Sequence, residues 1–370
     1  MSKIKDRREM TKNTKIENKA VLADGTKPKS EFPYKKILII ALAIVAVIAC
    51  VLLVANAFVD SYADKFATGE NHVNAQPTTE IKGELYENTD AYLSNPEFVK
   101  AYSAAVQNHA KNYTNVKADA NVYNYVVSIN YSADADSANL SAAMILSIDK
   151  VNNQVSYFSI NKSMLVYIPS VGVGPLYDAY GFGGGALLAQ TIENNFGVKI
   201  NGYVDMPLLS FAEAAAKLGG IKVDEPKNID SEQLLDTPEE IYNYVANSTY
   251  LPEPRTRNEA MTNVIKGLAA ASVEEGVFGI KGTVDTIVDS FDSYISREDF
   301  GNIISMGTKV FANDAKVYQI GYDTVEGVTK HYHADFDWAE PYLEFSSVNY
   351  EYEVQKLQSN MFPPVEEAAK

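Results

Sequence analysis

The feature that most constrains this chain is a run of nineteen residues, Ile37–Ala55, without a charged or strongly polar side chain. A helix of that length rises about 28 Å, which is close to the roughly 30 Å thickness of the hydrocarbon core of a bilayer. The pair Lys35-Lys36 comes directly before the run. We therefore expect a single membrane-spanning helix over 37–59, with the rest of the chain divided between the two sides of a membrane.

Charge is distributed unequally around this run. The 36 residues before it hold 11 Lys+Arg and 5 Asp+Glu, whereas the remainder of the chain holds 21 and 43. Lysine and arginine close to a span favour the cytoplasmic side. The sequence therefore predicts a single-pass protein of the cell membrane whose amino terminus is cytoplasmic and whose carboxyl-terminal domain is extracellular.

Two alternative readings of the apolar run are open. A cleaved signal peptide has an apolar core of only about 7–15 residues and ends at small residues, so this longer run favours an anchor. The stretch Val47-Ile48-Ala49-Cys50 has a superficial likeness to a bacterial lipoprotein box. However, the apolar helix continues after Cys50, which favours a cysteine buried inside the span.

Cysteine usage and charge exclude two further possibilities. Cys50 is the only cysteine, so the exported body has no intrachain disulfide and must be held together by packing. The acidic body is also unsuited to nucleic acid, because a phosphate backbone attracts basic surfaces. We expect the basic arm, 1–36, to be a short disordered tail and the membrane to be a partner of this chain.

Periodicity in the exported body predicts an α/β fold. β-Branched and aromatic residues recur in strand-length runs, and helical patterns alternate with them, as in a layered domain with a central mixed β-sheet flanked by helices. The expected parts are a cytoplasmic tail (1–36), the transmembrane helix (37–59), a stalk with an amphipathic helix from Pro96 to Ala110 (60–121), the α/β domain (122–345) and a carboxyl-terminal tail (346–370) that is frayed from Gln358 to Lys370.

Two local patterns bear on structure near a site. The strand runs Ala142–Ile148 and Val155–Ile160 flank a short polar connection, which predicts a β-hairpin. Further on, the glycine-rich stretch Tyr180–Gly185 precedes the helical pattern Ala186–Phe196. A glycine-rich turn before a helix can bind phosphate through backbone N–H groups, but this stretch lacks the residues of known nucleotide fingerprints, so a plain tight turn is the alternative.

The order and spacing of these patterns resemble the LytR–CpsA–Psr (LCP) family of cell-envelope proteins. The hairpin Met144–Asp149 with Val155–Ile160 looks like the paired strands of that family. Leu176–Gly184 looks like its "KINxAYxxGG" segment, and Tyr203–Asp205 with Leu218–Asp224 looks like its later "YxVxxxFxGFxxLVxxLGGVxVD" stretch. The resemblance covers about 122–344, most of the exported body.

The resemblance implies a function in cell wall biogenesis. Family members transfer a glycopolymer, such as teichoic acid or capsule, from a polyprenyl-pyrophosphate carrier to peptidoglycan or another envelope acceptor, with a metal ion such as magnesium. Their arginines and aspartates hold the pyrophosphate and the metal, since developing phosphoryl charge must be neutralised. The implied partners are therefore a polyprenyl-linked glycan and peptidoglycan.

This chain departs from the family at the charged positions. Leu140-Ser141-Ala142 stands where the family has Arg-Ser-Asp, and Asn161-Lys162-Ser163 stands where it has Pro-Arg-Asp. Pro175 and Tyr177 replace the lysine and asparagine of "KIN". The cations that remain at matching positions are Lys162 and Arg257, which the resemblance makes the pyrophosphate contacts. Lysine is a point charge and lacks the planar fork of arginine.

Two functions from different classes follow from these departures. One is a glycopolymer transferase with impaired or altered catalysis, in which Lys162 and Arg257 contact the pyrophosphate. The other is a non-catalytic LCP-like protein that binds lipid-linked glycan, or a partner, during cell wall assembly. An enzymatic activity, the glycan, the acceptor and the oligomeric state all stay undecided by the sequence.

A separate pattern near the carboxyl end could bind a metal. The residues His331, His333, Asp335 and Asp337 alternate with aromatic and small residues, so on a strand they would share one face. The alternative is a half-buried edge strand whose other face, including Trp338, contributes to the core.

Overall fold

A computed structural model describes most of the exported body. The described residues are 57, 60–78, 96–112, 116–130, 140–225, 228–246, 254–274, 281–282, 284–285, 288, 292–302, 315–322, 330–331, 342–343 and 347–363. All of them fall in the second of two units of the chain, Leu53–Lys370. The expected membrane span, 37–59, lies almost wholly outside this set. Among the helices that are described, none is long and apolar enough to cross a membrane.

A six-stranded mixed sheet forms the centre of the domain. Its strands, in spatial order, are β10 (Lys316–Ile320), β3 (Gln154–Ile160), β2 (Leu140–Asp149), β1 (Val122–Asn130), β6 (Gly202–Pro207) and β9 (Asp292–Ile295). Strands β1 and β6 are parallel, as are β10 and β3, and the remaining pairs are antiparallel. The expectation of a mixed sheet is confirmed.

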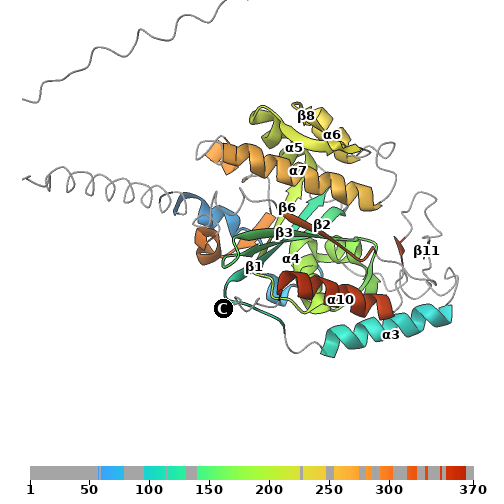
Figure 1. Cartoon of the computed structure of the whole chain (residues 1–370). Coiled ribbons are helices and arrows are strands. Elements are labelled where there is room, and N and C mark those ends of the chain that lie inside the picture. The colour runs from blue at the N-terminus through green and yellow to red at the C-terminus, as the bar shows by residue number, and fades with distance from the viewer. Residues whose placement is uncertain are drawn as a thin grey trace, which may run out of the picture. The chain divides into compact units, whose positions relative to one another are not determined.

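Helices cover both faces of this sheet (Figure 1). On one face lie α3 (Pro96–Asn112), α4 (Leu176–Phe196) and α10 (Ser347–Met361). On the other lie α5 (Leu208–Lys217), α6 (Pro238–Ala246) and α7 (Pro254–Glu274). We call these the α4 face and the α7 face. Each face carries its own cluster of buried apolar side chains, so the sheet has a core on both sides.

Short elements complete the described fold. Three two-stranded ladders pair β4 (Leu165–Ile168) with β5 (Gly172–Pro175), β7 (Ile221–Glu225) with β8 (Asn228–Leu235), and β11 (Lys330–His331) with β12 (Tyr342–Leu343). Two 3₁₀ helices, η1 (Ala63–Phe66) and η2 (His72–Asn74), lie in the segment between the expected span and the domain.

The expected hairpin is confirmed in β2 and β3. Asp149 pairs with Gln154 at its closed end, and the register runs from there to Ala143 opposite Ile160. The Asp149 carboxylate accepts hydrogen bonds from the backbone N–H of Val151 at 2.8 Å and of Asn152 at 3.0 Å. An aspartate at the start of a turn commonly satisfies backbone donors in this way, which explains why the polar connection reverses the chain here.

The glycine-rich stretch differs from the expected turn. Helix α4 begins at Leu176, ahead of the glycines, and is interrupted at Gly183 and Gly184. Gly184 has φ 60° and ψ −155°, a backbone conformation that is essentially restricted to glycine. The carbonyl of Phe182, next to this kink, accepts hydrogen bonds from the Thr78 N–H at 2.8 Å and its hydroxyl at 3.2 Å. The sequence pattern predicts a turn followed by a separate helix. The structure instead has one helix, α4, which bends at these glycines.

The carboxyl-terminal segment also differs from the tail that was expected. Residues Tyr350, Val354, Leu357 and Met361 of α10 are all buried in the core of the α4 face. Their spacing of four, three and four residues matches one face of a helix. The Tyr350 hydroxyl donates a hydrogen bond to the side-chain oxygen of Asn195 at 2.6 Å. Polar residues between the apolar ones had concealed this pattern.

Candidate functional site

Of the two cations proposed from the sequence, Lys162 lies at one end of the central sheet, and the structure describes only the backbone of Arg257. Lys162 follows the carboxyl end of β3, and its Nζ donates a hydrogen bond to the Leu140 carbonyl at 3.1 Å. Arg257 lies in the first turn of α7, and its side chain is outside the described part of the structure. Two residues further on, Glu259 accepts a hydrogen bond from Gln319 of β10. Gln319 pairs with Ser159, one residue before the end of β3.

The stretches that resemble the family come together around Lys162. The Lys162 carbonyl accepts a hydrogen bond from the Tyr177 N–H at 3.0 Å, and the Met164 carbonyl accepts one from the Leu176 N–H at 3.0 Å. The start of α4 is thereby joined to the loop after β3. Sequence segments that are about fifteen residues apart thus form one edge of the candidate site.

The neutral residues at the charged positions of the family are buried. Leu140, Ser141 and Ala142 begin β2 next to Lys162, and each is almost completely shielded from solvent. Ser163 is equally buried. Asn161 is fully buried as well, and its Nδ2 donates a hydrogen bond to the Gly321 carbonyl at 3.0 Å. Positions that are charged in the family pattern are therefore neutral and buried in this chain.

A half-buried carboxylate on the α4 face was not singled out from the sequence. Asp205, near the carboxyl end of β6, accepts hydrogen bonds from the Tyr180 hydroxyl at 2.8 Å, the Ser128 hydroxyl at 3.0 Å and the Asn130 amide at 3.4 Å. Asn130 also donates to the Tyr180 hydroxyl at 2.9 Å. We call these four side chains the Asp205 network, which connects β1, β6 and α4.

Burial dominates the protonation behaviour of this network. It raises the pKa of Asp205 from 3.8 to about 6, although the hydrogen bonds from Tyr180, Ser128 and Asn130 act in the opposite direction. Burial also raises the pKa of Tyr180, and the neighbouring charge of Asp205 adds to that rise. Tyr180 therefore remains a hydrogen-bond donor at neutral pH, and Asp205 is the member of the network that titrates.

Close approach of α4 to the sheet depends on a glycine. A Cβ atom added to Gly185 would stand 2.7 Å from the Tyr203 ring and 3.3 Å from the Asp205 Cβ. Because heavy atoms do not pack at 2.7 Å, any side chain here would displace the helix or the ring. Gly185, directly after the kink, thus allows Tyr180 to reach Asp205.

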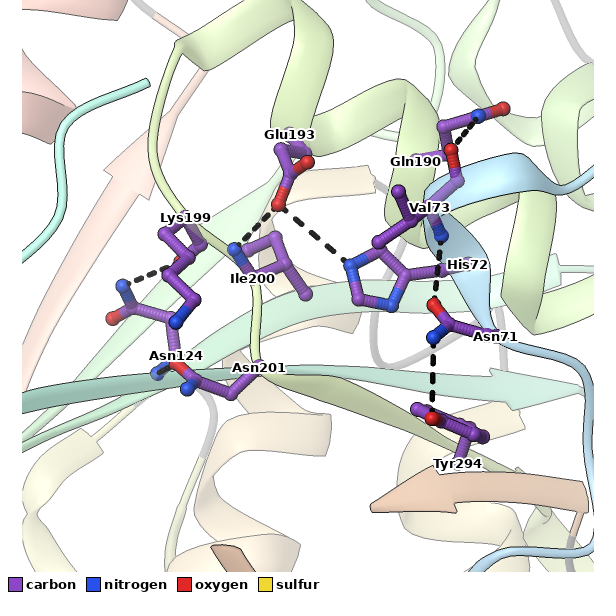
Figure 2. Close-up of polar contacts among 10 residues, drawn as sticks. All are labelled: Asn71, His72, Val73, Asn124, Gln190, Glu193, Lys199, Ile200, Asn201 and Tyr294. Carbon is purple, nitrogen blue, oxygen red and sulfur yellow. Dashed lines mark hydrogen bonds and ion pairs between the residues drawn. The ribbon is translucent and has the colours of Figure 1, made fainter. Parts of the chain in front are cut away.

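The segment after the expected span is fixed to the domain on the same face. Figure 2 shows the buried His72 ring directed at the Glu193 carboxylate of α4, with Nε2 at 3.7 Å from Oε2. The same carboxylate oxygen accepts a hydrogen bond from the Ile200 N–H at 2.8 Å, just before β6. Asn71 donates to the Tyr294 hydroxyl at 3.1 Å. This part of the expected stalk therefore packs on the domain.

A groove opens on the opposite side, around the edge strand β10. Its volume is about 500 Å³. Its walls come from α7 (Glu259, Asn263, Lys266), β10 (Val317, Tyr318) and α10 (Lys356), with Asp224 of β7 at one end. The groove begins two residues along α7 from Arg257. It is separated from the Asp205 network by two intervening strands, β3 and β2.

The sequence pattern that could bind a metal lies near the carboxyl end of the chain. Of the face formed by His331, His333, Asp335 and Asp337, the structure describes only the backbone of His331, in β11, so the other three lie outside the described residues. Within the described part of the chain, no group of three or more His, Cys, Asp or Glu side chains is placed to hold a metal ion.

Two residues of the Asp205 network, Tyr180 and Asp205, could have been recognised as candidates from the sequence. Tyr180 and Asp205 belong to the two separate stretches that carry the family resemblance, 176–184 and 203–205, and the structure brings them into contact. A polar residue inside an apolar strand such as β6 needs a partner. The sequence did not show which one, because the register of β6 beside β1 and the start of α4 were both unknown.

Residues 88–266 of this chain match the model of the LytR_cpsA_psr family. The chain is 28% identical over 105 residues to an uncharacterised protein of Staphylococcus aureus (strain NCTC 8325 / PS 47). That match covers 28% of this chain and 26% of the relative, so the chain spans about a quarter of the length of that curated protein.

Solved structures share the fold. The crystal structure of B. subtilis TagV superposes with a TM-score of 0.52 at 16% identity, covering 66% of this chain and 98% of TagV. The gbs0355 protein from Streptococcus agalactiae gives 0.52 at 11% identity, covering 65% and 88%. The Lin1025 protein from Listeria innocua gives 0.50 at 14% identity, covering 66% and 99%. At these identities the likeness establishes the fold alone.

Proposed function

We propose that this chain is a single-pass protein of the cell membrane whose extracellular domain binds polyprenyl-pyrophosphate-linked glycopolymer and attaches it to peptidoglycan. The match of residues 88–266 to the LytR_cpsA_psr family model supports this proposal. The apolar run 37–55, with its basic amino-terminal arm, supports the location. In this arrangement Lys162 and Arg257 contact the pyrophosphate.

The proposed reaction is a phosphoryl transfer. A hydroxyl of the acceptor forms a bond to the phosphorus that carries the glycan, and the bond from that phosphorus to the bridging oxygen breaks. Polyprenyl phosphate leaves, and the hydroxyl proton passes to a base or to solvent. Cations beside the bridging oxygen stabilise the charge that develops on the leaving group. Lys162 and Arg257 would supply this charge, with Lys162 as a point charge.

Magnesium belongs to the proposal through the family resemblance. Magnesium prefers carboxylate oxygens and retained waters in an octahedral shell. The residues at the family's aspartate positions, Ala142 and Ser163, are neutral and buried, so they do not fit a magnesium site. No step of the proposed reaction is therefore assigned to a metal here.

A non-catalytic function is the second candidate, and one observation favours it. The family's charged triplets are replaced by the neutral, buried Leu140-Ser141-Ala142 and by Asn161 and Ser163 around Lys162. A site with one lysine and one arginine can still attract an anionic carrier, but it stabilises a transition state less than a full set of arginines. This chain would then bind lipid-linked glycan during wall assembly without transferring it.

A transfer assay with the full chain separates the two candidates. The protein is reconstituted in phosphatidylglycerol vesicles with a labelled polyprenyl-pyrophosphate oligosaccharide, purified peptidoglycan and Mg²⁺. Transfer of label to peptidoglycan that falls at least about tenfold in Arg257→Ala and in Lys162→Ala supports the transferase. The matched control is Lys217→Ala, an exposed lysine at the end of α5, which should leave transfer unchanged.

The other outcomes are equally decisive. Saturable binding of the labelled carrier without transfer supports the non-catalytic function. Absence of both binding and transfer, with the protein folded in the vesicles, contradicts both candidates.

A further inference from the structure

We propose that the groove between α7, β10 and α10 is a subsite for sugar rings of the glycan. The proposal rests on the proposed function for the source of the sugar, but the groove itself is defined by described side chains alone. Its volume of about 500 Å³ is within the roughly 300–1,000 Å³ usual for sites that hold small ligands. The groove is thus large enough for a short glycan segment.

The chemistry of the groove favours a polyhydroxylated ligand. Asp224 and Glu259 contribute carboxylates, Asn263 an amide and Lys266 an ammonium group. Such groups alternate hydrogen-bond donors with acceptors, which matches hydroxyl and acetamido substituents. A polyprenyl tail would instead require a lining that is predominantly hydrophobic. The groove therefore suits the sugar part of a lipid-linked glycan better than its lipid part.

Val317 of β10 offers an exposed apolar surface beside the polar walls, since its side chain is 41% exposed. Successive side chains of a strand point to opposite faces, and the Tyr318 ring stacks on Phe158 on the α4 face, with ring centroids 4.9 Å apart and 17° between the planes. The C–H face of a sugar ring can pack on Val317 while its hydroxyl groups reach the polar walls.

Charge in the groove is balanced, which argues for a neutral sugar. The groove is lined by two acids, Asp224 and Glu259, and by two bases, Lys266 and Lys356. Lys356 lies 3.8 Å from the Glu353 carboxylate, whereas Lys266 makes no ion pair or hydrogen bond among the residues that the structure describes. The two acids would repel a strongly anionic polymer, and the two lysines would repel a cation. Lys266 is the group best placed to donate to a ligand oxygen.

The position of the groove relates it to the proposed reaction centre. Glu259 is two residues from Arg257 along α7, and Asn263 and Lys266 follow on the next turns of that helix. Residues three and four apart share one helix face. Glu259, Asn263 and Lys266 therefore line one face of α7, and Arg257 lies in the first turn of the same helix.

Binding of chitotetraose to the full chain in detergent tests this proposal. Chitotetraose is a soluble β-1,4 tetramer of N-acetylglucosamine, and titration calorimetry measures its affinity. We expect saturable binding that is abolished in Val317→Trp, because the indole fills the groove. Lys266→Met and Asp224→Asn should each weaken binding by roughly tenfold, the usual effect of losing a hydrogen bond to a charged group. Matched controls are Val151→Trp in the exposed hairpin turn and Lys217→Met on α5.

The outcomes separate this proposal from the proposed function. If chitotetraose does not bind at millimolar concentration, or binds Val317→Trp as well as the unaltered chain, the groove is not a sugar subsite. Transfer of the labelled carrier could still occur in that case, through Lys162 and Arg257 alone. Conversely, groove-dependent binding without any transfer supports the subsite and the non-catalytic function together.

Discussion

On the α4 face of the sheet, the Asp205 carboxylate accepts hydrogen bonds from Tyr180, Ser128 and Asn130 and fastens a kinked helix to two strands. On the α7 face, Asp224, Asn263 and Lys266 line a groove of about 500 Å³. Polar groups that bond to one another inside a core contribute to the uniqueness and stability of the fold. Polar groups around a groove remain available for a ligand. The two faces should therefore respond differently to substitution.

The largest loss of stability is expected in the core of the α4 face. Leu357 of α10 is fully buried, so Leu357→Ala leaves a cavity and should lower the free energy of unfolding by about 3–4 kcal/mol. Urea unfolding of the full chain in detergent measures this change. Tyr352→Ala on the same helix is the control, because Tyr352 is 53% exposed, and it should cost less than about 1 kcal/mol. Equal effects of the two substitutions would show that α10 does not pack on the domain.

The Asp205 network should make stability depend on pH. Because burial raises the pKa of Asp205 from 3.8 to about 6, the folded protein binds this proton more tightly than the unfolded chain. Its contribution is fully present below pH 3.8 and is lost as the pH rises through about 6, a change on the order of 3 kcal/mol.

Asp205→Asn removes the titrating group and should flatten this part of the curve. The measurement is the free energy of unfolding of both proteins between pH 4 and 7. The difference between the two curves, rather than either curve alone, isolates Asp205 from other acids. Parallel curves over this range would contradict a raised pKa.

A smaller loss is expected where α4 approaches the sheet. In Gly185→Ala the new Cβ would stand 2.7 Å from the Tyr203 ring, so helix and ring must separate, at a cost of about 2 kcal/mol. Gly282→Ala is the matched control, since a Cβ there meets nothing within 4 Å. It should leave the unfolding free energy unchanged or raise it slightly, because alanine loses less entropy on folding. A cost at Gly282 equal to that at Gly185 would rule out the close-approach explanation.

The smallest effects on stability are expected in the groove. Lys266→Met and Val317→Trp alter side chains beside solvent and should change the unfolding free energy by no more than about 0.5 kcal/mol. The same two variants should lose binding of chitotetraose. A loss of stability above about 2 kcal/mol in either one would mean that the groove is part of the core, and the contrast between the two faces would fail.

Much of the fold followed from local patterns in the sequence. The hairpin of β2 and β3 and the helix α3 each follow from a local pattern, and the structure confirms them. Helix α10 was missed because Tyr350, Val354, Leu357 and Met361 are separated by polar residues, so its amphipathic character is weak until a core is present to cover it. The glycines of α4 predict a turn as readily as a kinked helix, because glycine favours both structures. The packing of Gly185 on Tyr203, which the sequence does not show, favours the kinked helix.

The candidate site was predictable only in part. The sequence predicted Lys162 and Arg257 through a family pattern, and the structure has Lys162 directly after β3 and the backbone of Arg257 in the first turn of α7. The Asp205 network depends on the register of β6 against β1, in which Ser128 lies opposite Asp205. The groove depends on β10 being the edge strand between α7 and α10. Long-range pairing of this kind is not encoded in any single local pattern.

Binding of a polyprenyl-pyrophosphate-linked oligosaccharide by the full chain tests the central claim most directly, because both candidate functions require it. The measurement is a titration of the labelled carrier into phosphatidylglycerol vesicles that contain the protein. We predict saturable binding that weakens at least about tenfold in Arg257→Ala and in Val317→Trp, and that is unchanged in Lys217→Ala. Labelled carrier that partitions equally into vesicles with and without the protein would contradict the account.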